Sequence, residues 1–190
     1  MTWTTSIENK LSEIGMRGLF LVKDRQAHTK AFIRMKDMFH QEAFSNIQHE
    51  ASKLRTYGIL KTEIGLEQYL TEITSIKDRT NLTKLRLSNH SLMIEKGRHL
   101  GITDPNLRFC PFCPGQVEDE RHFLLDCKSF SKLRNDLFHK TGNTVISFPY
   151  ANKSQKFDIL MRNTYLSPLT AQYITKALEM REDLLENQQA

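Results

Sequence analysis

All three cysteines of this 190-residue chain lie within a single window of 18 residues, together with one histidine. Cys110 and Cys113 are separated by two residues, His122 follows after eight more, and Cys127 after a further four. Three thiols and one imidazole are the four ligands that a tetrahedral Zn²⁺ site requires. Because no cysteine is left over, the pattern C-x2-C-x8-H-x4-C predicts that one Zn²⁺ holds this part of the fold together.

The ligand set also predicts what kind of metal site this is. Four protein ligands leave no coordination position for an activated water, so we expect a structural site and not a catalytic one. His122 and Cys127 lie about 140° apart on a regular helix, so His122 is expected in a short helix that begins near Asp119, with Cys127 at or just past its end. The acidic residues 118–120 either cap this helix or hydrogen-bond the free nitrogen of His122. The alternatives to a metal site are three ordinary buried cysteines beside an unrelated histidine, or a disulfide between the first two cysteines.

Positive charge is concentrated immediately upstream of the first predicted ligand. Of the net charge of +5, residues 77–108 contribute +4, whereas residues 109–190 are balanced. A basic segment beside a zinc site favours contact with phosphate groups. The alternative is that these basic side chains form an ordinary surface exposed to solvent. Phe109 and Phe112 either stack on bases or pack around the metal. The candidate nucleic-acid contacts are Lys84, Arg86, Lys96, Arg98 and Arg108.

Apolar residues recur mostly at helical spacing, which predicts a mainly α fold with a small embedded zinc knuckle and little or no sheet. The first helix is expected from Thr5, with Glu8 in a capping box, and ends near Gly15. Leu92–Ile94 is expected to form a short strand or extended piece. Further helices are expected over residues 28–52, with Phe32, Met35, Phe39, Ala43 and Ile47 on one face, and over residues 65–73, 81–88, 129–139, 155–162 and from Ser167 onward.

We expect three regions along the chain: a helical N-terminal region (1–76), the basic segment with the zinc-binding module (77–140), and C-terminal helices (141–190). No apolar stretch approaches the length that crosses a bilayer, so no membrane association is expected. The first residues lack the charged and apolar regions of a signal peptide. We therefore expect an intracellular protein with reduced thiols, in the nucleus or the cytoplasm.

Several runs of residues around the cysteines match a known module. They are 82–90 (LTKLRLSNH), 94–98 (IEKGR), the C-x2-C pair and 118–127 (EDERHFLLDC). Together they resemble the zinc-binding C-terminal region that follows the polymerase domain in non-long-terminal-repeat (LINE-type) retrotransposon reverse transcriptases. Ser131–Arg134 fits the same module. The resemblance covers about residues 50 to 138 and is weak elsewhere.

The resemblance implies a nucleic-acid-associated accessory domain, whose partners are RNA or single-stranded DNA and an upstream polymerase domain. The family's metal ligands correspond to Cys110, Cys113, His122 and Cys127. Lys128 stands where the family often has proline, which affects the turn and not the ligation. The chain has no Asp-Asp pair, so the polymerase active site does not carry over, and it shows no endonuclease constellation. We therefore expect no enzyme activity from this chain, which is either a piece of such an element or a short gene carrying its tail. The alternative function is a protein-interaction module whose surface is shaped by zinc.

Overall fold

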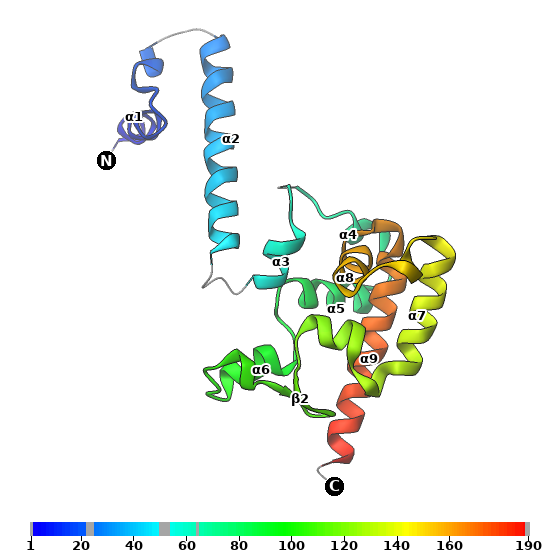
Figure 1. Ribbon diagram of the computed structural model, residues 1–190. Coiled ribbons are helices and arrows are strands. Elements are labelled where there is room, and N and C mark those ends of the chain that lie inside the picture. Colours follow the sequence, from blue (N-terminus) through cyan, green and yellow to red (C-terminus); the bar gives the residue numbers. More distant parts are fainter. Residues whose placement is uncertain (1, 22–24, 50–53, 64, 189–190) are drawn as a thin grey trace. The chain divides into compact units, whose positions relative to one another are not determined.

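The computed structural model describes residues 2–21, 25–49, 54–63 and 65–188, and Figure 1 follows the chain through them. Contacts divide the chain into two compact units, Met1–Ser52 and Lys53–Ala190, each with its own internal packing. The basic segment, the cysteines and the C-terminal helices all belong to the second unit. The finer three-part division expected from the sequence stays a prediction.

The first unit contains α1 (Trp3–Glu13), a 3₁₀ turn (Arg17–Leu21) and α2 (Arg25–Gln48). The capping residue of α1 is Thr2, three residues before the position expected from the sequence, and its hydroxyl accepts a hydrogen bond from the backbone N–H of Thr5 (3.3 Å). Gly15 adopts a φ of +74° just after the helix, a conformation that glycine tolerates and that ends a helix readily.

The apolar residues that the sequence places on one face of α2 lie largely at the surface. Phe32 and Phe39 are 64% and 61% exposed, and Met35 is 42% exposed. Ala43 and Ile47, nearer the end of the helix, are half-buried. The long helix itself is confirmed, although residues 50–52 of the expected range lie outside the described residues.

The second unit is built around α9 (Ser167–Asn187), against which α5 (Ile76–Arg86), α7 (Ser131–Thr144) and α8 (Lys153–Arg162) pack (Figure 1). Fully buried side chains of α9 form the centre of this contact: Ala171, Ile174 and Ala177. Pro168 stands in the first turn of α9, where its missing N–H costs no hydrogen bond.

Shorter elements complete the described part of this unit. They are α3 (Arg55–Leu60), α4 (Tyr69–Glu72), α6 (Met93–His99), and 3₁₀ turns at Pro105–Leu107, Lys128–Phe130, Phe148–Tyr150 and Thr164–Leu166. The sequence did not predict α3, and the strand expected at Leu92–Ile94 is wrong, because Leu92 is the N-cap of α6. A short apolar run has no periodicity that separates a strand from a buried helical turn, and both Leu92 and Ile94 are buried.

One antiparallel pair of strands is the only sheet among the described residues. Strand β1 (Phe109–Cys110) pairs with β2 (Cys113–Val117), so that Phe109 faces Val117 and Cys110 faces Cys113. This confirms a mainly α fold with a small embedded Cys/His knuckle. Among the described helices, none combines the length and the hydropathy that crossing a bilayer requires.

Candidate metal centre

The four predicted ligands come together in the second unit. Cys110 ends β1 and Cys113 begins β2, on either side of a tight turn. His122 begins a π-helical turn (His122–Asp126), and Cys127 follows this turn directly. All four residues are buried, and their sulfur and nitrogen ligand atoms lie within 4.8 Å of one another. This cluster could hold a metal ion.

The π-helical turn explains how residues five apart can face one point. In such a turn the backbone bonds run from residue i+5 to residue i, and here the N–H of Cys127 donates to the carbonyl of His122 (2.8 Å). Cys127 is therefore stacked over His122, instead of lying about 140° away as on a regular helix. The prediction that His122 and Cys127 cannot both face one ion from an unbroken α-helix is correct. The π-helical turn that brings them together was not predicted.

The distances between the sulfurs fit a shared ion better than a covalent bond. The Sγ of Cys127 lies 3.9 Å from the Sγ of Cys110 and 3.9 Å from the Sγ of Cys113. A disulfide requires about 2.05 Å, and all three cysteines are free. Two sulfurs bound tetrahedrally at about 2.3 Å from one Zn²⁺ are about 3.8 Å apart.

One sulfur of the cluster favours the thiolate form even without a cation. The pKa of Cys127 is lowered to about 4, chiefly by the hydrogen bond from Cys110. Burial acts in the opposite direction, and interactions with His122 and Cys113 lower the pKa further. The same hydrogen bond and burial raise the pKa of the Cys110 thiol, and repulsion by the negative charge of a Cys127 thiolate raises it further. A bound cation removes that repulsion, and all three sulfurs can then ionise.

The ring of His122 has a free position for such a cation. Its Nε2 atom is buried and has no hydrogen-bond partner among the described residues, whereas buried polar atoms are nearly always paired. None of the acidic residues 118–120 hydrogen-bonds the ring. The carboxylate of Asp119 instead accepts from the backbone N–H of His122 (2.7 Å), so the capping interpretation holds for that residue.

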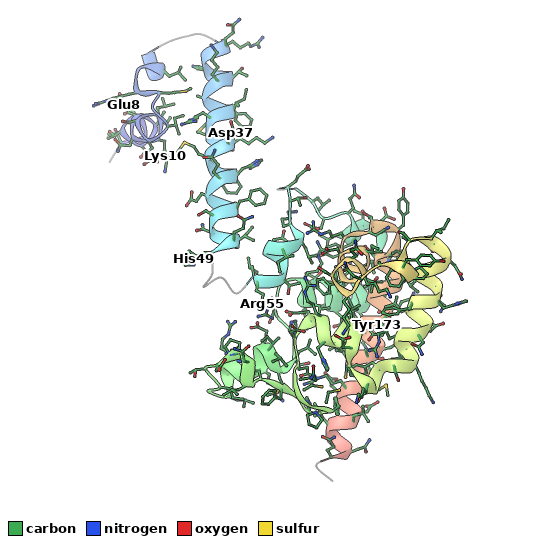
Figure 2. The ribbon with its side chains drawn as sticks, viewed as in Figure 1. Glu8, Lys10, Asp37, His49, Arg55 and Tyr173 are labelled. Atoms are coloured by element: carbon green, nitrogen blue, oxygen red, sulfur yellow. The ribbon has the colours of Figure 1, made fainter. Side chains whose placement is uncertain are left out.

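The core of the unit holds the π-helical turn in place. The side chain of Arg134 on α7 donates to the carbonyl of Cys127 (2.7 Å), and the hydroxyl of Tyr173 on α9 donates to the carbonyl of Phe123 (3.1 Å). The rings of Phe123 and Phe130 meet edge to face. Figure 2 shows Tyr173 within the second unit, and burial raises the pKa of its hydroxyl. Helices α7 and α9 thus hold the turn that carries the histidine and the last cysteine.

Glu118 connects the knuckle to the far end of α9. Its carboxylate oxygens accept two hydrogen bonds of 2.8 Å from Arg181, and one of them also accepts from the backbone N–H of Met93 (2.7 Å). Glu118 and Arg181 are 1% and 2% exposed. Because the pair is buried, bidentate and 63 residues apart in sequence, it fixes β2 against α9 and α6.

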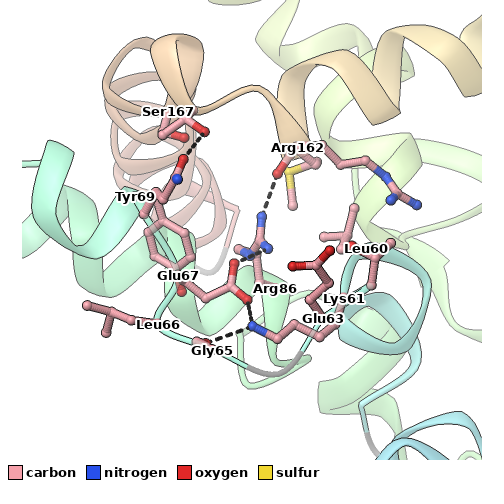
Figure 3. A pocket seen from close by; sticks show the side chains of 14 residues that line it. Leu60, Lys61, Glu63, Gly65, Leu66, Glu67, Tyr69, Arg86, Arg162 and Ser167 are labelled. Atoms are coloured by element: carbon pink, nitrogen blue, oxygen red, sulfur yellow. Dashed lines mark hydrogen bonds and ion pairs between the residues drawn. The ribbon is translucent and has the colours of Figure 1, made fainter.

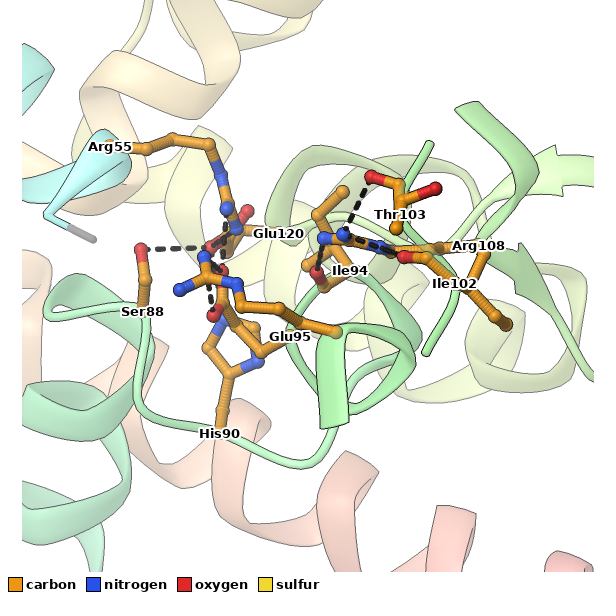
Figure 4. Close-up of polar contacts among 10 residues, drawn as sticks. Arg55, Ser88, His90, Ile94, Glu95, Ile102, Thr103, Arg108 and Glu120 are labelled. Atoms are coloured by element: carbon orange, nitrogen blue, oxygen red, sulfur yellow. Dashed lines mark hydrogen bonds and ion pairs between the residues drawn. The ribbon is translucent and has the colours of Figure 1, made fainter. Parts of the chain in front are cut away.

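Glu120 connects the knuckle to α3 and to the loop that follows α5. It receives one hydrogen bond from Arg55 (2.6 Å) and lies 2.9 Å from the Nε2 of His90 (Figure 4). Arg55 also binds Glu95 on α6 (2.6 Å). Burial by itself raises the pKa of Glu120, but the hydrogen bond and charge of His90 and the charge of Arg55 lower it to about 2.

The partners of Glu118 and Glu120 were not predicted from the sequence. Both carboxylates were expected to cap the short helix, because acidic residues are common at the start of a helix. Their actual partners lie between 25 and 65 residues away in the chain. No spacing or periodicity in a single sequence indicates such pairs.

The five basic candidates separate into two groups. Lys84 on α5 and Lys96 and Arg98 on α6 are exposed, although Arg98 also pairs with Glu95 (3.1 Å). Lys96 and Arg98 lie two positions apart on one helix and so point about 200° apart. The structure therefore leaves these three cations available to solvent, but does not align them along one helix face.

Arg86 and Arg108 are each 5% exposed, and their guanidinium groups bind inside the protein. Arg86 pairs with Glu67 (2.9 Å) in the wall of a pocket, where the same carboxylate binds Lys61 (Figure 3). Arg108 donates to the backbone carbonyls of Ile94, Ile102 and Thr103 (Figure 4). A Cβ at Gly97 would lie 2.7 Å from the Cγ of Arg108, so only glycine leaves room for it. The expectation that Arg86 and Arg108 contact phosphate groups is therefore wrong, because neither guanidinium group reaches the surface.

The two phenylalanines of the knuckle also differ in exposure, one packing on the core and the other lying at the surface. Phe112 packs on the core and meets Phe130 edge to face (ring centroids 6.4 Å apart). Phe109 is 42% exposed. Core packing is thus the role of Phe112, while Phe109 keeps a ring surface that a base could contact.

Comparisons of the chain with family models, with curated proteins and with solved structures give no match. The resemblance to the LINE-type reverse transcriptase tail therefore stays a prediction that depends on the residues quoted for it.

Proposed function

We propose that Cys110, Cys113, His122 and Cys127 bind one Zn²⁺ and that the ion is structural. The observation that carries this proposal is the closed, buried cluster of three free thiols and one unpartnered imidazole nitrogen. Thiolate and imidazole ligands in a tetrahedral arrangement are typical of Zn²⁺. With all four positions taken by protein atoms, no position is left for a reacting water, so the site is non-catalytic.

The same proposal assigns the second unit a role as a nucleic-acid-binding accessory domain, related to the tail of LINE-type reverse transcriptases. The support is the resemblance over residues 82–127 and the basic excess of residues 77–108. The exposed members of that segment, Lys84, Lys96 and Arg98, are the phosphate contacts, and Phe109 is the residue placed to stack on a base. RNA or single-stranded DNA is the partner, with an upstream polymerase domain as a second one.

Salt-dependent binding tests this role. We expect a Lys84→Gln, Lys96→Gln, Arg98→Gln triple variant to bind a single-stranded 12-mer about tenfold more weakly than the parent. A plot of the logarithm of the association constant against the logarithm of the salt concentration has a negative slope. Loss of three phosphate contacts should make this slope shallower by about 2. Fluorescence anisotropy over a series of salt concentrations measures both quantities.

The matched control removes the same charge from another surface of the second unit. Lys132→Gln, Lys140→Gln, Lys176→Gln changes three exposed lysines on α7 and α9. If this control weakens binding as much as the first triple, net charge and not position explains the effect, and the assignment of these contacts is wrong.

A second candidate function is favoured by one observation in the first unit. The exposed apolar side chains of α2, among them Phe32, Ile33 and Phe39, form a surface of the kind that contacts another protein. In that case the zinc knuckle only shapes the fold and the protein is an interaction module. Absence of salt-dependent binding to either RNA or single-stranded DNA would favour this alternative.

A further inference from the structure

The first unit of the chain buries few of its own side chains. Among those that the structure describes there, only Ile14 and Ala31 are buried. A helix in water is stabilised mainly by packing one of its faces, and a unit of this size seldom buries enough apolar surface by itself. The long helix α2 therefore gains stability from any further surface that covers it.

One side of α2 carries the apolar side chains that such a surface would cover. Phe32 and Phe39 lie two turns apart on the same side of the helix, with Met35 between them, and all three are exposed. Ile33 is also exposed and lies at one edge of this side, whereas the buried Ala31 lies at the other edge. We call Phe32, Ile33, Met35 and Phe39 the apolar face of α2. An exposed apolar patch of this kind is typical of a protein–protein contact.

The charged side chains of α2 identify the partner that fits this face. Arg25 and Glu42 lie at equal distances on either side of one point in the sequence, just before Arg34, and so do Lys30 and Asp37. The side chains of both pairs are exposed, and Figure 2 labels Asp37 among them. A second copy of α2, antiparallel and centred on the same point, places each of these cations opposite an anion of the other copy. A parallel copy instead places like charges side by side, which is unfavourable.

The two remaining cations of α2 are compatible with the antiparallel pair. Arg34 lies about 200° around the helix from Phe32 and so points away from the apolar face. Lys36 lies on that face, one turn from each phenylalanine, and the antiparallel alignment brings it beside Phe32 of the other copy. Its aliphatic stem can cover apolar surface there, and its ammonium group can lie over the aromatic ring.

We propose that two copies of the chain associate through the apolar face of α2 as an antiparallel helix pair, centred just before Arg34. The interface has two-fold symmetry, so each favourable contact occurs twice. One helix face from each copy makes a small interface of the kind found in weak complexes, and we expect a dissociation constant of about 10 μM. The inference goes beyond the proposed zinc site and nucleic-acid role, and depends on neither.

Sedimentation velocity of the full-length zinc-loaded chain, from about 1 to 200 μM, tests the association. The parent is expected to change from monomer to dimer over this range. The Phe32→Gln, Phe39→Gln double variant should associate at least about tenfold more weakly, because the largest apolar side chains of the face are lost. Tyr150→Gln, Tyr165→Gln is the matched control: it removes two exposed aromatic side chains from the second unit and should leave the association unchanged.

Two charge reversals test the antiparallel alignment and leave every apolar side chain in place. Lys30→Glu alone, or Asp37→Lys alone, sets like charges opposite each other twice in a dimer. Each variant should therefore self-associate about fivefold to tenfold more weakly than the parent at low salt. An equal mixture of the two variants restores an attractive pair at both places and should associate about as tightly as the parent. Both positions are exposed, so the reversals leave the packing within the chain unchanged.

Three results would overturn the inference, and none of them affects the zinc site or nucleic-acid binding. A parent protein that stays monomeric up to about 200 μM shows that no second copy covers the face. A dimer that the phenylalanine variant forms as tightly as the parent uses another surface. A mixture of the charge variants that associates no more tightly than either variant alone contradicts the antiparallel alignment, and with it the reason for choosing a second copy over a different protein.

Discussion

Replacement of Cys127 by serine is expected to abolish stoichiometric metal binding and to lower the melting temperature by more than about 10 °C. Cys127 is fully buried, and its sulfur lies 3.9 Å from each of the other two sulfurs. Serine keeps the size of the side chain but supplies no thiolate, so a three-ligand site remains and the binding energy that supports folding is lost. Differential scanning calorimetry and metal analysis of the purified variant measure the two effects.

The chain contains no cysteine outside the cluster, so the matched control for this experiment uses histidine. His122→Gln should reproduce the loss of metal and of stability, whereas His139→Gln, at an exposed site on α7, should change neither. A Cys127→Ser protein that still holds one metal ion per chain and melts with the parent would show that the sulfur is an ordinary core atom.

Removal of Arg181 is expected to lower the free energy of unfolding by about 3–5 kcal/mol. The guanidinium group is 2% exposed and binds both oxygens of Glu118. Arg181→Met therefore leaves a carboxylate buried without its counter-charge beside the knuckle. Urea denaturation of the zinc-loaded protein measures the change. A second replacement, Glu118→Met, should restore part of the loss, because two apolar side chains leave no unpaired charge.

The control for the buried pair is an exposed pair that involves the same helix. Lys77 and Glu179 join α5 to α9 at the surface, where both side chains are largely exposed to solvent. Lys77→Met should change the stability little, because water and salt screen such a pair. An effect of Arg181→Met no larger than that of Lys77→Met would mean that the buried pair does not fix the knuckle to α9.

Local features of the sequence were sufficient to predict the cluster and most of the helices. The spacing of Cys110, Cys113, His122 and Cys127 is a short-range pattern whose chemistry depends only on ligand type and number. The helices that begin near Ser131 and at Ser167 follow from apolar periodicity and from the proline in the first turn of α9. Such signals lie within one or two turns of the residues that they describe.

What the sequence did not show depends on contacts between distant segments. Arg86 and Arg108 have the same local appearance as Lys84 and Arg98, yet the fold buries the first two against carbonyls and a carboxylate. Glu118 and Glu120 looked like helix-capping residues and instead bind Arg181 and Arg55. Whether a charged residue is at the surface or in a buried pair is decided by packing, which a single sequence does not reveal.

The most direct test of the central claim is the zinc content of the full-length protein, purified under reducing conditions, measured together with its melting temperature before and after a strong chelator. Three sulfurs and one imidazole around a single point predict one zinc ion per chain and a marked fall in melting temperature once the ion is removed. A folded protein that contains no zinc, or one whose melting temperature is unchanged after the metal has been removed, would contradict the proposal of a structural zinc site.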